Sequence, residues 1–423
     1  MADIAVVGTG YVGLTTGAYL AHIGHNVTCA DVIEEKVEAL SRGEVPIHED
    51  GLTDMVNEGI KAGRLRFVLG ATAAVQDAEF VFLCLPTPQG EDGSADLSYV
   101  ESVAREIGPH VRSDGIVVNK STVPVGSNLR VAALLDRDDV HVVSNPEFLR
   151  EGQALHDSLN PDRIVIGAYD QEAALRLAEL YESLHAPVLV TDPASAETIK
   201  YVANAFLATK VSFINAVAHF CEMVGADVKD VALGMGQDKR IGFEFLRPGP
   251  GWGGSCFPKD TRALIHMAED RGYPFDLLRS VVSVNNEQYE RVVEKIAFAA
   301  GGSIEGKTVG VWGLTFKART DDMRESPSLF IIERLQAKGA TVKAFDPMVK
   351  KQLDGITVCD DAYAAAEGAD VLAVLTEWDE FRYLDMAKVK NLVTTPTIVD
   401  ARNLLDPVAV RRHGFTYDGI GRL

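Results

Sequence analysis

The chain has few cysteines and a shortage of basic residues. Five of its 423 residues are cysteines (Cys29, Cys84, Cys221, Cys256 and Cys359), and their odd number and scattered positions do not indicate a disulfide framework. Lys and Arg together number 41 against 61 Asp and Glu, which gives a net charge of −20. We therefore expect no nucleic acid or anionic membrane as a partner, and an anionic substrate only where basic residues gather.

Long apolar segments are also missing. No run reaches the roughly 20 residues that span a bilayer, and a strand is predicted from Ile4, where a signal peptide would lie. We therefore expect a soluble, cytoplasmic protein. A chain of 423 residues is too long for one hydrophobic core, so two or three domains are expected.

The N-terminal segment has the pattern of a dinucleotide-binding unit. A strand predicted at Ile4–Val7 is followed by the glycine loop Gly8–Gly13 and by a helix predicted from about Leu14 to Ile23. A second strand, Asn26–Ala30, ends at Asp31. The order strand, glycine loop, helix, strand and acid is that of a doubly wound α/β domain.

Each glycine of this loop has its own purpose. Gly8 makes the tight turn, Gly10 lets a pyrophosphate approach the backbone, and Gly13 packs the helix on the strand. The phosphate charge would lie at the helix N-terminus, where unpaired N–H groups favour an anion. Asp31 can accept hydrogen bonds from ribose hydroxyls and would repel a 2′-phosphate, so the sequence predicts NAD rather than NADP.

Three more buried strands are predicted in this part, each followed by a polar loop. They are Phe80–Leu85, Gly115–Asn119 and Val140–Val143. Ligands of doubly wound sheets bind beyond the carboxyl ends of strands, so these loops should line one cleft. Thr122 offers a hydroxyl there, and Glu147 and Glu151 would share a face if their segment were helical. The same two acids could instead be a solvated helix start.

A single cysteine lies in a glycine-rich loop near the middle of the chain. The loop reads Pro248-Gly-Pro-Gly-Trp-Gly-Gly-Ser-Cys256-Phe-Pro-Lys259-Asp260. Cysteine is usually a small buried hydrophobe, but the glycines remove the side chains that would bury it and let the backbone approach a ligand. Because Lys259 and Asp260 can both carry charge, Cys256 is a candidate nucleophile. A buried structural thiol is the alternative.

A long helix is predicted at Ala194–Val224. Lys200 and Asn204 lie four residues apart on it, where each could donate a hydrogen bond to a developing oxyanion. An ordinary surface lysine and a polar helix residue are the alternative interpretation. A helix of this length between two α/β halves could also form the spine of a dimer.

The last third predicts a second doubly wound domain. Gly339–Asp346 repeats the glycine-to-aspartate separation of Gly24–Asp31. The predicted elements are Lys307–Gly313, Leu329–Lys338, Val371–Leu375 and Thr397–Asp400. The glycine turn here lacks GxGxxG and carries Phe316, Lys317 and later Arg324, which suits another phosphate ligand such as a nucleotide sugar. The predicted fold class is α/β, with two Rossmann-like domains joined by a central helical region.

Other chemistries lack their motifs. There is no HExxH, and His22 and His25 at a helix end have no further ligands nearby in the sequence, so no metal site is expected. There is no GxSxG, so serine hydrolase chemistry is unsupported. A non-catalytic nucleotide-binding regulator is the contrasting class, but it would have no use for a thiol, an acid and a lysine around a glycine loop.

These motifs together resemble the UDP-glucose 6-dehydrogenase family, within the broader UDP-glucose/GDP-mannose dehydrogenases. The resemblance covers essentially the whole length. Its segments are GTGYVGL, NKSTVPVG, NPEFLREG, the helix with Lys200 and Asn204, RIGFEFLRPGPGWGGSCFPKD, FKARTDDMRESPS and DARN. It implies oxidation of the C6 alcohol of a nucleotide sugar to a carboxylate, with two NAD⁺ consumed and two NADH released.

The resemblance implies a covalent mechanism on Cys256, which matches the family nucleophile. A thiolate adds to the aldehyde left by the first hydride transfer, and the thioester left by the second is hydrolysed by water. Asp260 would act with a bound water in proton transfer, and Glu147 as general base or acid for hydrolysis.

The resemblance also carries over binding positions. Lys200 and Asn204 match the pair that holds the C6 oxyanion, and Thr122 matches the threonine that orients water and cofactor. The positions expected to contact NAD are Gly8, Gly10, Tyr11, Val12, Gly13, Asp31, Lys36, Thr87, Thr122, Glu151, Lys259 and Arg324. The positions expected to contact the sugar nucleotide are Phe148, Leu149, Arg150, Glu151, Lys200, Asn204, Arg240, Phe245, Leu246, Arg247, Pro248, Gly249, Gly253, Phe316, Lys317 and Arg402.

The resemblance leaves the substrate and the assembly less defined. UDP-glucose is expected, with TDP-glucose, GDP-mannose or a UDP-N-acetylhexosamine as alternatives. The base stays open, because thymidine and uridine differ by one methyl group, which gives only about 1–3 kcal/mol of discrimination. Arg240 resembles an arginine that enters the site from a partner subunit, so a homodimer is expected. The expected domains are an NAD-binding domain at 1–195, a helical domain with the cysteine loop at 196–300, and a sugar-nucleotide domain at 301–423.

Overall fold

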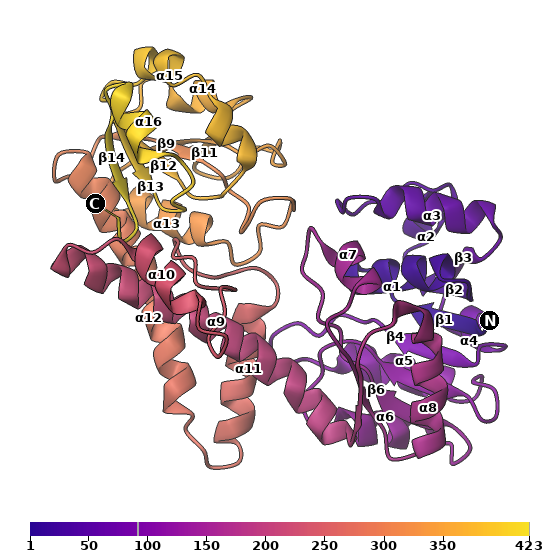
Figure 1. Ribbon diagram of the computed structural model, residues 1–423. Helices are drawn as coiled ribbons and strands as arrows, with labels where there is room; N and C mark the ends of the chain where they lie inside the picture. The colour runs from indigo at the N-terminus through magenta and orange to yellow at the C-terminus, as the bar shows by residue number, and fades with distance from the viewer. Residues whose placement is uncertain (91–92, 423) are drawn as a thin grey trace. The chain divides into compact units, whose positions relative to one another are not determined.

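The computed structural model describes residues 1–90 and 93–422. These divide into two compact units, each built around its own sheet (Figure 1). Unit 1 comprises Met1–Ala203 and Arg262–Met267, and unit 2 comprises Asn204–Thr261 and Ala268–Leu423. The expected division into three domains at 195 and 300 stays a prediction.

Unit 1 contains an eight-stranded sheet in the order β3-β2-β1-β4-β5-β6-β7-β8. Its strands are β1 (Asp3–Val7), β2 (Asn26–Asp31), β3 (Leu65–Leu69), β4 (Phe80–Leu83), β5 (Ile116–Asn119), β6 (His141–Ser144), β7 (Ile164–Gly167) and β8 (Val188–Thr191). All neighbours pair in parallel except β6 with β7. Its helices are α1 (Tyr11–His22), α2 (Glu34–Ser41), α3 (Leu52–Lys61), α4 (Thr72–Val75), α5 (Ser98–Ile107), α6 (Ser127–Leu135), α7 (Ala154–Leu159), α8 (Gln171–Leu180) and the 3₁₀ turn η1 (Glu182–Leu184).

Helices cover both faces of this sheet, which is why its strands read as continuous apolar runs. In β1, Ile4 and Val6 belong to the core on one face, while Ala5 and Val7 belong to the core on the other. Helix α1 packs with α3 and α7, and α5 packs with α4 and α6. The two layers leave the carboxyl ends of the strands as the edge from which polar loops emerge.

Unit 2 contains a six-stranded parallel sheet in the order β11-β10-β9-β12-β13-β14. The strands are β9 (Thr308–Trp312), β10 (Thr341–Phe345), β11 (Ile356–Val358), β12 (Val371–Val374), β13 (Thr397–Asp400) and β14 (Thr416–Gly419). The helices are α10 (Val228–Gly236), α12 (Asp276–Ala299), α13 (Pro327–Ala337), α14 (Ala362–Ala366), α15 (Met386–Leu392), α16 (Pro407–Arg412) and the 3₁₀ turn η2 (Asp379–Tyr383). The strand order is that of a Rossmann fold, so the predicted fold class is confirmed.

Two helices continue from one unit into the other along the chain. Helix α9 spans Pro193–Val224 and α11 spans Phe257–Glu269. By length and composition α9 is apolar enough to cross a membrane, although the sequence led us to expect no such run. That test is weak evidence, because a core helix of a soluble protein also passes it, and 44% of the most apolar window of α9 is buried.

The structure contains the predicted helices and strands, with small shifts at their ends. Helix α1 begins at Tyr11 instead of Leu14, directly after the glycine loop. The segment with Glu147 and Glu151 is not helical, so neither a shared helix face nor a helix start describes these two acids. Glu147 lies in the loop after β6.

Candidate active site

The glycine loop of unit 1 has the geometry that the sequence predicts for its turn. Gly8 has a φ of +96°, and its N–H donates to Ala30 O at 2.8 Å. A Cβ on Gly8 would lie 2.5 Å from Cys84 O, and one on Gly13 would lie 1.9 Å from Gly8 O. A Cβ on Gly10 would meet nothing within 4 Å, so open space adjoins the N-terminus of α1. Val12 is half-buried in the first turn of that helix.

Asp31 lies at the end of β2 as a charged acceptor. It accepts hydrogen bonds from Thr9 N at 3.1 Å, from the Thr9 hydroxyl, and from Val32 N at 2.8 Å. Lys36 Nζ lies 2.9 Å from its Oδ2. Burial alone would raise the pKa of Asp31, but the hydrogen bonds from Thr9 and Lys36 outweigh it and lower the pKa to about 2. An ionised acid here suits ribose hydroxyls and disfavours a 2′-phosphate.

Tyr11 connects the first helix to the loop that contains Glu151. Its hydroxyl donates to Glu49, and Gly152 N–H lies 2.8 Å from both the tyrosine oxygen and Glu49 Oε2. Burial, followed by the bond to Glu49, raises the pKa of Tyr11. Sequence reasoning missed Glu49. It follows no strand and belongs to no motif, so only its burial in the fold reveals it.

The loops after β4 and β5 meet at the carboxyl edge of the sheet. Thr87 Oγ1 donates to Thr122 O at 2.9 Å, which joins two residues predicted to contact the cofactor. The Ser121 hydroxyl donates to Leu85 O at 2.7 Å. These two loops therefore gather as the sequence predicts.

Glu147 and Lys200 form a buried ion pair. Their Oε1 and Nζ atoms lie 2.9 Å apart, with side chains 7% and 4% exposed. Leu149 N also donates to Glu147 at 2.7 Å. Burial would raise the pKa of Glu147, but the charge and hydrogen bond of Lys200 outweigh it and lower the pKa. Lys200 Nζ lies 5.5 Å from the ring centroid of Phe148, and Arg163 stacks on that ring at 3.7 Å.

Lys120 is a buried cation that sequence reasoning missed. Its Nζ donates to Asn145 Oδ1 at 3.0 Å, and the Tyr181 hydroxyl donates to the same oxygen at 2.6 Å. Burial lowers the pKa of Lys120 to about 8. Its place directly after the buried strand β5 was the available signal, because polar residues there reach the ligand edge of the sheet.

In unit 2, Cys256 lies immediately before helix α11. Asp260 N donates to Cys256 O at 2.8 Å, so the cysteine carbonyl accepts the first hydrogen bond of the helix. The thiol is half-buried, and its Sγ lies 3.6 Å from Ser255 Oγ. The partial positive charge of a helix N-terminus favours an anionic group at this position.

Asp260 lies one turn beyond the thiol and is 1% exposed. It accepts hydrogen bonds from Asn204 Nδ2 at 2.6 Å and from Lys259 Nζ at 2.5 Å. Three predicted site residues therefore form one cluster within unit 2. Asn204 has a specific partner there, so the alternative of an ordinary polar helix residue does not describe it.

The glycines of the cysteine loop serve its own packing. A Cβ on Gly251 would lie 2.6 Å from the Tyr289 ring, one on Gly253 would lie 1.9 Å from Glu325 O, and one on Gly254 would lie 2.8 Å from the Phe316 ring. At these three positions a side chain would meet other parts of the same chain, and Gly251 and Gly254 also have positive φ angles.

Buried polar groups fix the backbone of this loop. Trp252 N donates to Asn285 Oδ1 at 2.8 Å, and Trp252 O accepts from Asn285 Nδ2 at 3.0 Å and from the Tyr289 hydroxyl at 2.9 Å. The Trp252 indole donates to Ser212 Oγ at 2.9 Å. Sequence reasoning missed these positioning residues, which look like polar interruptions in helical patterns.

The segment Phe245–Gly249 leads into the loop. Phe245 has a φ of +63°, which is unusual for a residue with a side chain. Gly249 N donates to Asn215 Oδ1 and Gly249 O accepts from Gln288 Nε2, both at 2.8 Å. Between them Leu246 is buried, Arg247 is exposed and Pro248 is half-buried.

Arg402 joins three loops at the carboxyl edge of the second sheet. Its guanidinium donates to Leu375 O and to Phe316 O, both at 2.8 Å, and lies 3.0 Å from Glu377 Oε2. Lys317 Nζ lies 5.3 Å from the Phe316 ring centroid. The fold thus brings together Phe316, Lys317 and Arg402, three of the residues predicted to bind the sugar nucleotide.

Three other predicted arginines pair with a nearby aspartate on the surface. The pairs are Arg150 with Asp157 at 2.6 Å, Arg240 with Asp238 at 2.5 Å, and Arg324 with Asp322 at 2.7 Å. Only the Arg240 pair is largely exposed, with side chains 88% and 36% exposed, and such surface pairs contribute little to stability. Asp157 and Asp322 are 12% and 9% exposed.

Fold and site together define a class of protein. Unit 1 has an open glycine turn followed by the ionised Asp31, and unit 2 has a thiol at a helix start beside a buried Asn–Asp–Lys cluster. Among the described residues, no group of three His, Cys, Asp or Glu side chains could hold a metal ion. The class is an NAD-dependent oxidoreductase with a second nucleotide-type domain.

Comparison with known proteins identifies the family within that class. The chain belongs to the UDP-glucose/GDP-mannose dehydrogenase family: residues 2–185 match its NAD binding domain, 194–287 its central domain and 310–407 its UDP binding domain. The chain is 45% identical to UDP-glucose 6-dehydrogenase TuaD of Bacillus subtilis over 100% of this chain and 94% of that protein.

Two further relatives extend the comparison. The chain is 45% identical to UDP-glucose 6-dehydrogenase of Rhizobium meliloti, over 99% of each chain. The solved structure of a UDP-glucose dehydrogenase from the archaeon Pyrobaculum islandicum is 37% identical, with a TM-score of 0.93, covering 100% of this chain and 98% of that one. The predicted family, NAD as cofactor and a nucleotide-sugar substrate class are thereby confirmed.

Proposed function

We propose that the chain oxidises UDP-glucose at C6 to UDP-glucuronate, with two NAD⁺ reduced for each sugar. The observation that carries this proposal is the cluster of Asn204, Lys259 and Asp260 one helical turn from Cys256, with Asp260 1% exposed. The choice of UDP-glucose as the substrate rests on the relatives named UDP-glucose 6-dehydrogenase. The overall balance is RCH₂OH + 2 NAD⁺ + H₂O → RCOO⁻ + 2 NADH + 3 H⁺.

Cys256 acts as the nucleophile between the two oxidations. Its sulfur adds to the carbonyl carbon of the C6 aldehyde, which forms a C–S bond and leaves an oxyanion. Loss of hydride from that carbon gives a thioester, and water then displaces the sulfur to give the acid. The thiolate is both a strong nucleophile and a good leaving group, so one residue can serve both steps.

Donors and bases around the reacting carbon have separate tasks. Lys200 and Asn204 donate hydrogen bonds to the C6 oxygen as its negative charge develops. Asp260 accepts a proton through a bound water, and Glu147, already ionised beside Lys200, is the general base for hydrolysis. Thr122 orients the attacking water.

The cofactor is held by the glycine loop, and the substrate by basic and apolar residues. When bound, NAD accepts hydride from C6. The residues proposed to hold it are Gly8, Gly10, Tyr11, Val12, Gly13, Asp31, Lys36, Thr87, Thr122, Glu151, Lys259 and Arg324. The residues proposed to hold the sugar nucleotide are Phe148 to Glu151, Phe245 to Gly249, Gly253, Phe316, Lys317 and Arg402, with Arg240 from a second subunit.

NADH production against a substrate panel tests this function. The purified protein is mixed with NAD⁺ and, in turn, UDP-glucose, TDP-glucose, GDP-mannose and UDP-N-acetylglucosamine. We expect the fastest reaction with UDP-glucose and two NADH per sugar consumed. A single NADH with accumulation of the aldehyde would contradict the thioester route. A faster reaction with another nucleotide sugar would show that this sugar is the preferred substrate. No change in NADH absorbance with any of them would favour a non-catalytic binding protein.

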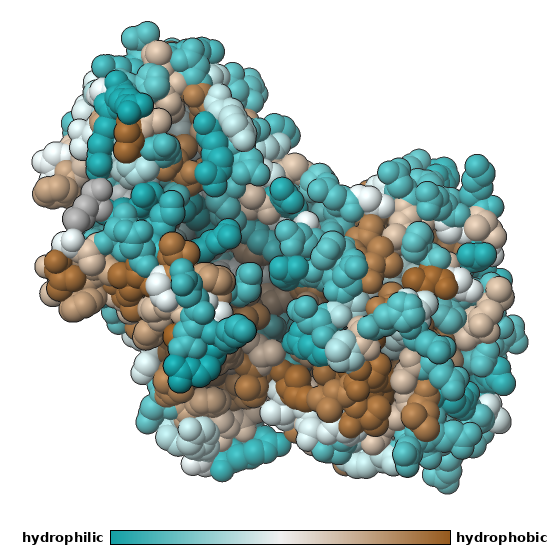
Figure 2. Space-filling model, viewed as in Figure 1, coloured by the Kyte–Doolittle hydropathy of each residue, from teal (hydrophilic) through white to brown (hydrophobic). Residues whose placement is uncertain are grey.

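We also propose that the protein works as a soluble, cytoplasmic homodimer joined along α9. Phe206, Phe213 and Phe220 recur every seven residues on this helix and are 63%, 52% and 61% exposed. Seven residues are nearly two helical turns, so the three rings share one face. Figure 2 shows hydrophobic surface over α9 and α10, where Leu233 adds a further exposed side chain. A second copy would cover this face.

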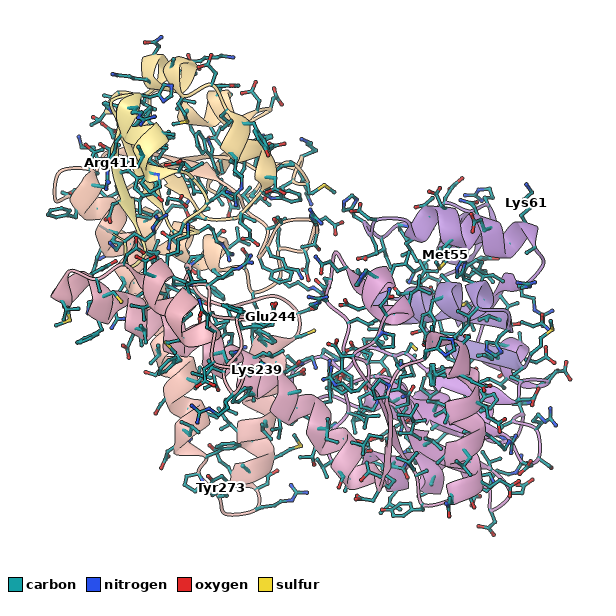
Figure 3. All side chains as sticks on the ribbon, in the orientation of Figure 1. Met55, Lys61, Lys239, Glu244, Tyr273 and Arg411 are labelled. Carbon is teal, nitrogen blue, oxygen red and sulfur yellow. The ribbon has the colours of Figure 1, made fainter. Side chains whose placement is uncertain are left out.

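Arg240 lies next to that face on the exposed loop after α10. Figure 3 labels its neighbours Lys239 and Glu244 on the same loop. The Arg240 side chain is 88% exposed and bound to Asp238 of its own loop. We propose that it reaches the sugar nucleotide of the other subunit.

A mixing experiment tests the shared site. Cys256→Ala and Arg240→Ala homodimers, each of low activity, are unfolded, mixed and refolded together. If Arg240 acts across the interface, the mixed dimer regains one competent site and activity rises above that of either parent. Activity no higher than that of the parents would place Arg240 in its own subunit's site. Phe213→Glu should give monomers in analytical ultracentrifugation.

A further inference from the structure

A small cavity adjoins the predicted catalytic residues Lys200 and Thr122 within unit 1. Its volume is about 10 Å³, which is close to the 10–15 Å³ that one water molecule needs. It is lined by Asn119, Ser121, Thr122, Val123, Ser144, Pro146, Glu197 and Lys200. All of these residues except Thr122 are buried, so the cavity lies beneath the loop after β5 and beside α9.

Asn119 faces this cavity without a protein partner. It is the last residue of β5 and is 2% exposed. Neither its amide oxygen nor its amide nitrogen has a hydrogen-bond partner among the described residues. Buried amides are nearly always hydrogen-bonded, because leaving one unsatisfied costs its full desolvation free energy. The amide therefore points to a small polar ligand that can both donate and accept.

Glu197 contributes a carboxylate to the lining of the same cavity. It is 3% exposed and accepts hydrogen bonds from Gly126 N at 2.7 Å, Asn128 N at 2.9 Å and Ser144 Oγ at 3.0 Å. The first two donors belong to the start of α6, so the carboxylate caps that helix. Burial raises the pKa of Glu197 despite these bonds, so a further donor would stabilise its charge.

Helix α9 carries both Glu197 and the predicted catalytic residue Lys200. Glu197 and Lys200 lie three residues apart, which places them on one face of the helix. Lys200 Nζ in turn binds Glu147 at 2.9 Å. Any group that fixes Glu197 against the end of β5 therefore also fixes the position of the Lys200 ammonium.

We propose that this cavity binds one ordered water, held by Asn119 and Glu197, which joins the end of β5 to α9 and positions Lys200. A water molecule carries two donors and two acceptor sites, so it satisfies the amide of Asn119 and the carboxylate of Glu197 at once. It is a structural ligand. Asn119 and Glu197 are positioning residues that act through α9. The water site is independent of the proposed function, and only its effect on Lys200 rests on that function.

A crystal structure of the unmodified enzyme tests the water directly. We expect a density peak within hydrogen-bond distance of an Asn119 amide atom and of a Glu197 carboxylate oxygen, at a resolution that shows ordered solvent. Absence of density in the cavity at that resolution would overturn the proposal, whatever the enzyme's activity.

Thermal unfolding of Asn119→Leu gives a second test by the sign of its shift. Leucine has the same branching and the same number of side-chain heavy atoms as asparagine, but it is larger and has no polar atoms. If a water bridges the amide to Glu197, the variant leaves that water or the carboxylate without a hydrogen-bond partner. The thermal unfolding midpoint then falls. If the amide is unsatisfied in the native state, removing it relieves a penalty, and the midpoint rises. A rise would overturn the proposal.

Kinetics test the positioning of Lys200. Because a small misplacement of a catalytic group can cost up to a hundredfold in rate, we expect kcat of Asn119→Leu to fall about tenfold with little change in the KM for either substrate. Asn119→Ser, which keeps a hydroxyl and leaves room for a second water, should recover most of kcat. Unchanged kcat in a folded Asn119→Leu enzyme would overturn the positioning role. Inactivity of the unmodified enzyme would instead be a failure of the proposed function.

Discussion

The two sheets share one construction at the turn after their first strands. Gly8 and Gly313 have φ angles of +96° and +100°. Their N–H groups donate to Ala30 O and Phe345 O, each at 2.8 Å. In both units the acceptor carbonyl belongs to the residue before an aspartate that ends the second strand.

The two aspartates are used differently. Asp31 of unit 1 has a side chain 9% exposed and a cation, Lys36, among its donors. Asp346 of unit 2 is 0% exposed and accepts from Leu314 N at 2.8 Å, from Thr315 N and its hydroxyl at 3.0 Å, and from the Trp378 indole at 3.0 Å. These donors are all neutral.

The segments that follow the turns differ as well. Helix α1 begins at Tyr11, so its N-terminus adjoins the glycine turn. Helix α13 begins only at Pro327, and the intervening loop carries Phe316 and Lys317. The same strand, turn and acid are thus followed directly by a helix N-terminus beside open space in unit 1. In unit 2 the acid is fully buried and the turn leads into a loop.

The proposed nucleophile lies in unit 2 and the proposed glycine turn for NAD lies in unit 1, so Cys256→Ala should separate acid formation from cofactor binding most strongly. We expect acid formation to fall by about four orders of magnitude or more, as for loss of other catalytic nucleophiles. NAD⁺ affinity, measured by calorimetry, should remain within about twofold, because every residue of the glycine turn is intact. Cys359→Ala, in the same unit and far from any predicted site residue in the sequence, is the matched control. Retained turnover in Cys256→Ala would show that another residue is the nucleophile.

Asp346→Ala tests whether the second acid is structural. The substitution removes the acceptor of four N–H donors, those of Leu314, Thr315, Met348 and Trp378. We therefore expect a loss of about 3 kcal/mol in the free energy of unfolding, measured with urea. Asp379→Ala, at a side chain 67% exposed in the same unit, should change stability by less than about 0.5 kcal/mol. An Asp346→Ala protein as stable as its parent would mean that the donors around it find water, and the contrast with Asp31 would fail.

Asp31→Ala tests the other half of the comparison. Loss of a charged acceptor for the ribose hydroxyls should raise the KM for NAD⁺ about tenfold to hundredfold, with kcat at saturating NAD⁺ little changed. The preference for NAD over NADP should also shrink, because the repelling charge is gone. Asp54→Ala, an exposed acid on α3 of the same unit, serves as control. An unchanged KM would show that the ribose does not lie at Asp31.

Sequence patterns predicted those parts of the molecule whose structure depends on residues close together in the chain. Buried strands, the turn at Gly8 and the glycine-to-aspartate repeat at Asp346 follow from periodicity and from glycine geometry. The cluster of Asn204 and Asp260 followed from family motifs, since 56 residues separate the two along the chain.

The missed features depend on partners that are distant in sequence. Nothing near Asp346 in the chain indicates that Trp378 covers it, and nothing near Lys120 indicates Asn145. The packing around the loop glycines at 251, 253 and 254 does not follow from the sequence, because a missing side chain looks the same whichever neighbour requires it. Tertiary packing decides between these interpretations.

The pH dependence of stability gives the smallest and most selective test of the charge on Asp31. Its pKa of about 2 lies below the ordinary value of 3.8, so the carboxylate stabilises the native state fully above about pH 4 and less as the pH falls toward 2. Because Lys36 is partly exposed, screening reduces the change between pH 6 and pH 3 to about 0.5 kcal/mol. Urea unfolding of the parent and of Asp31→Asn, which cannot titrate, should therefore converge as the pH falls. A constant difference between the two proteins across this range would mean that Lys36 and Thr9 do not lower the pKa of Asp31.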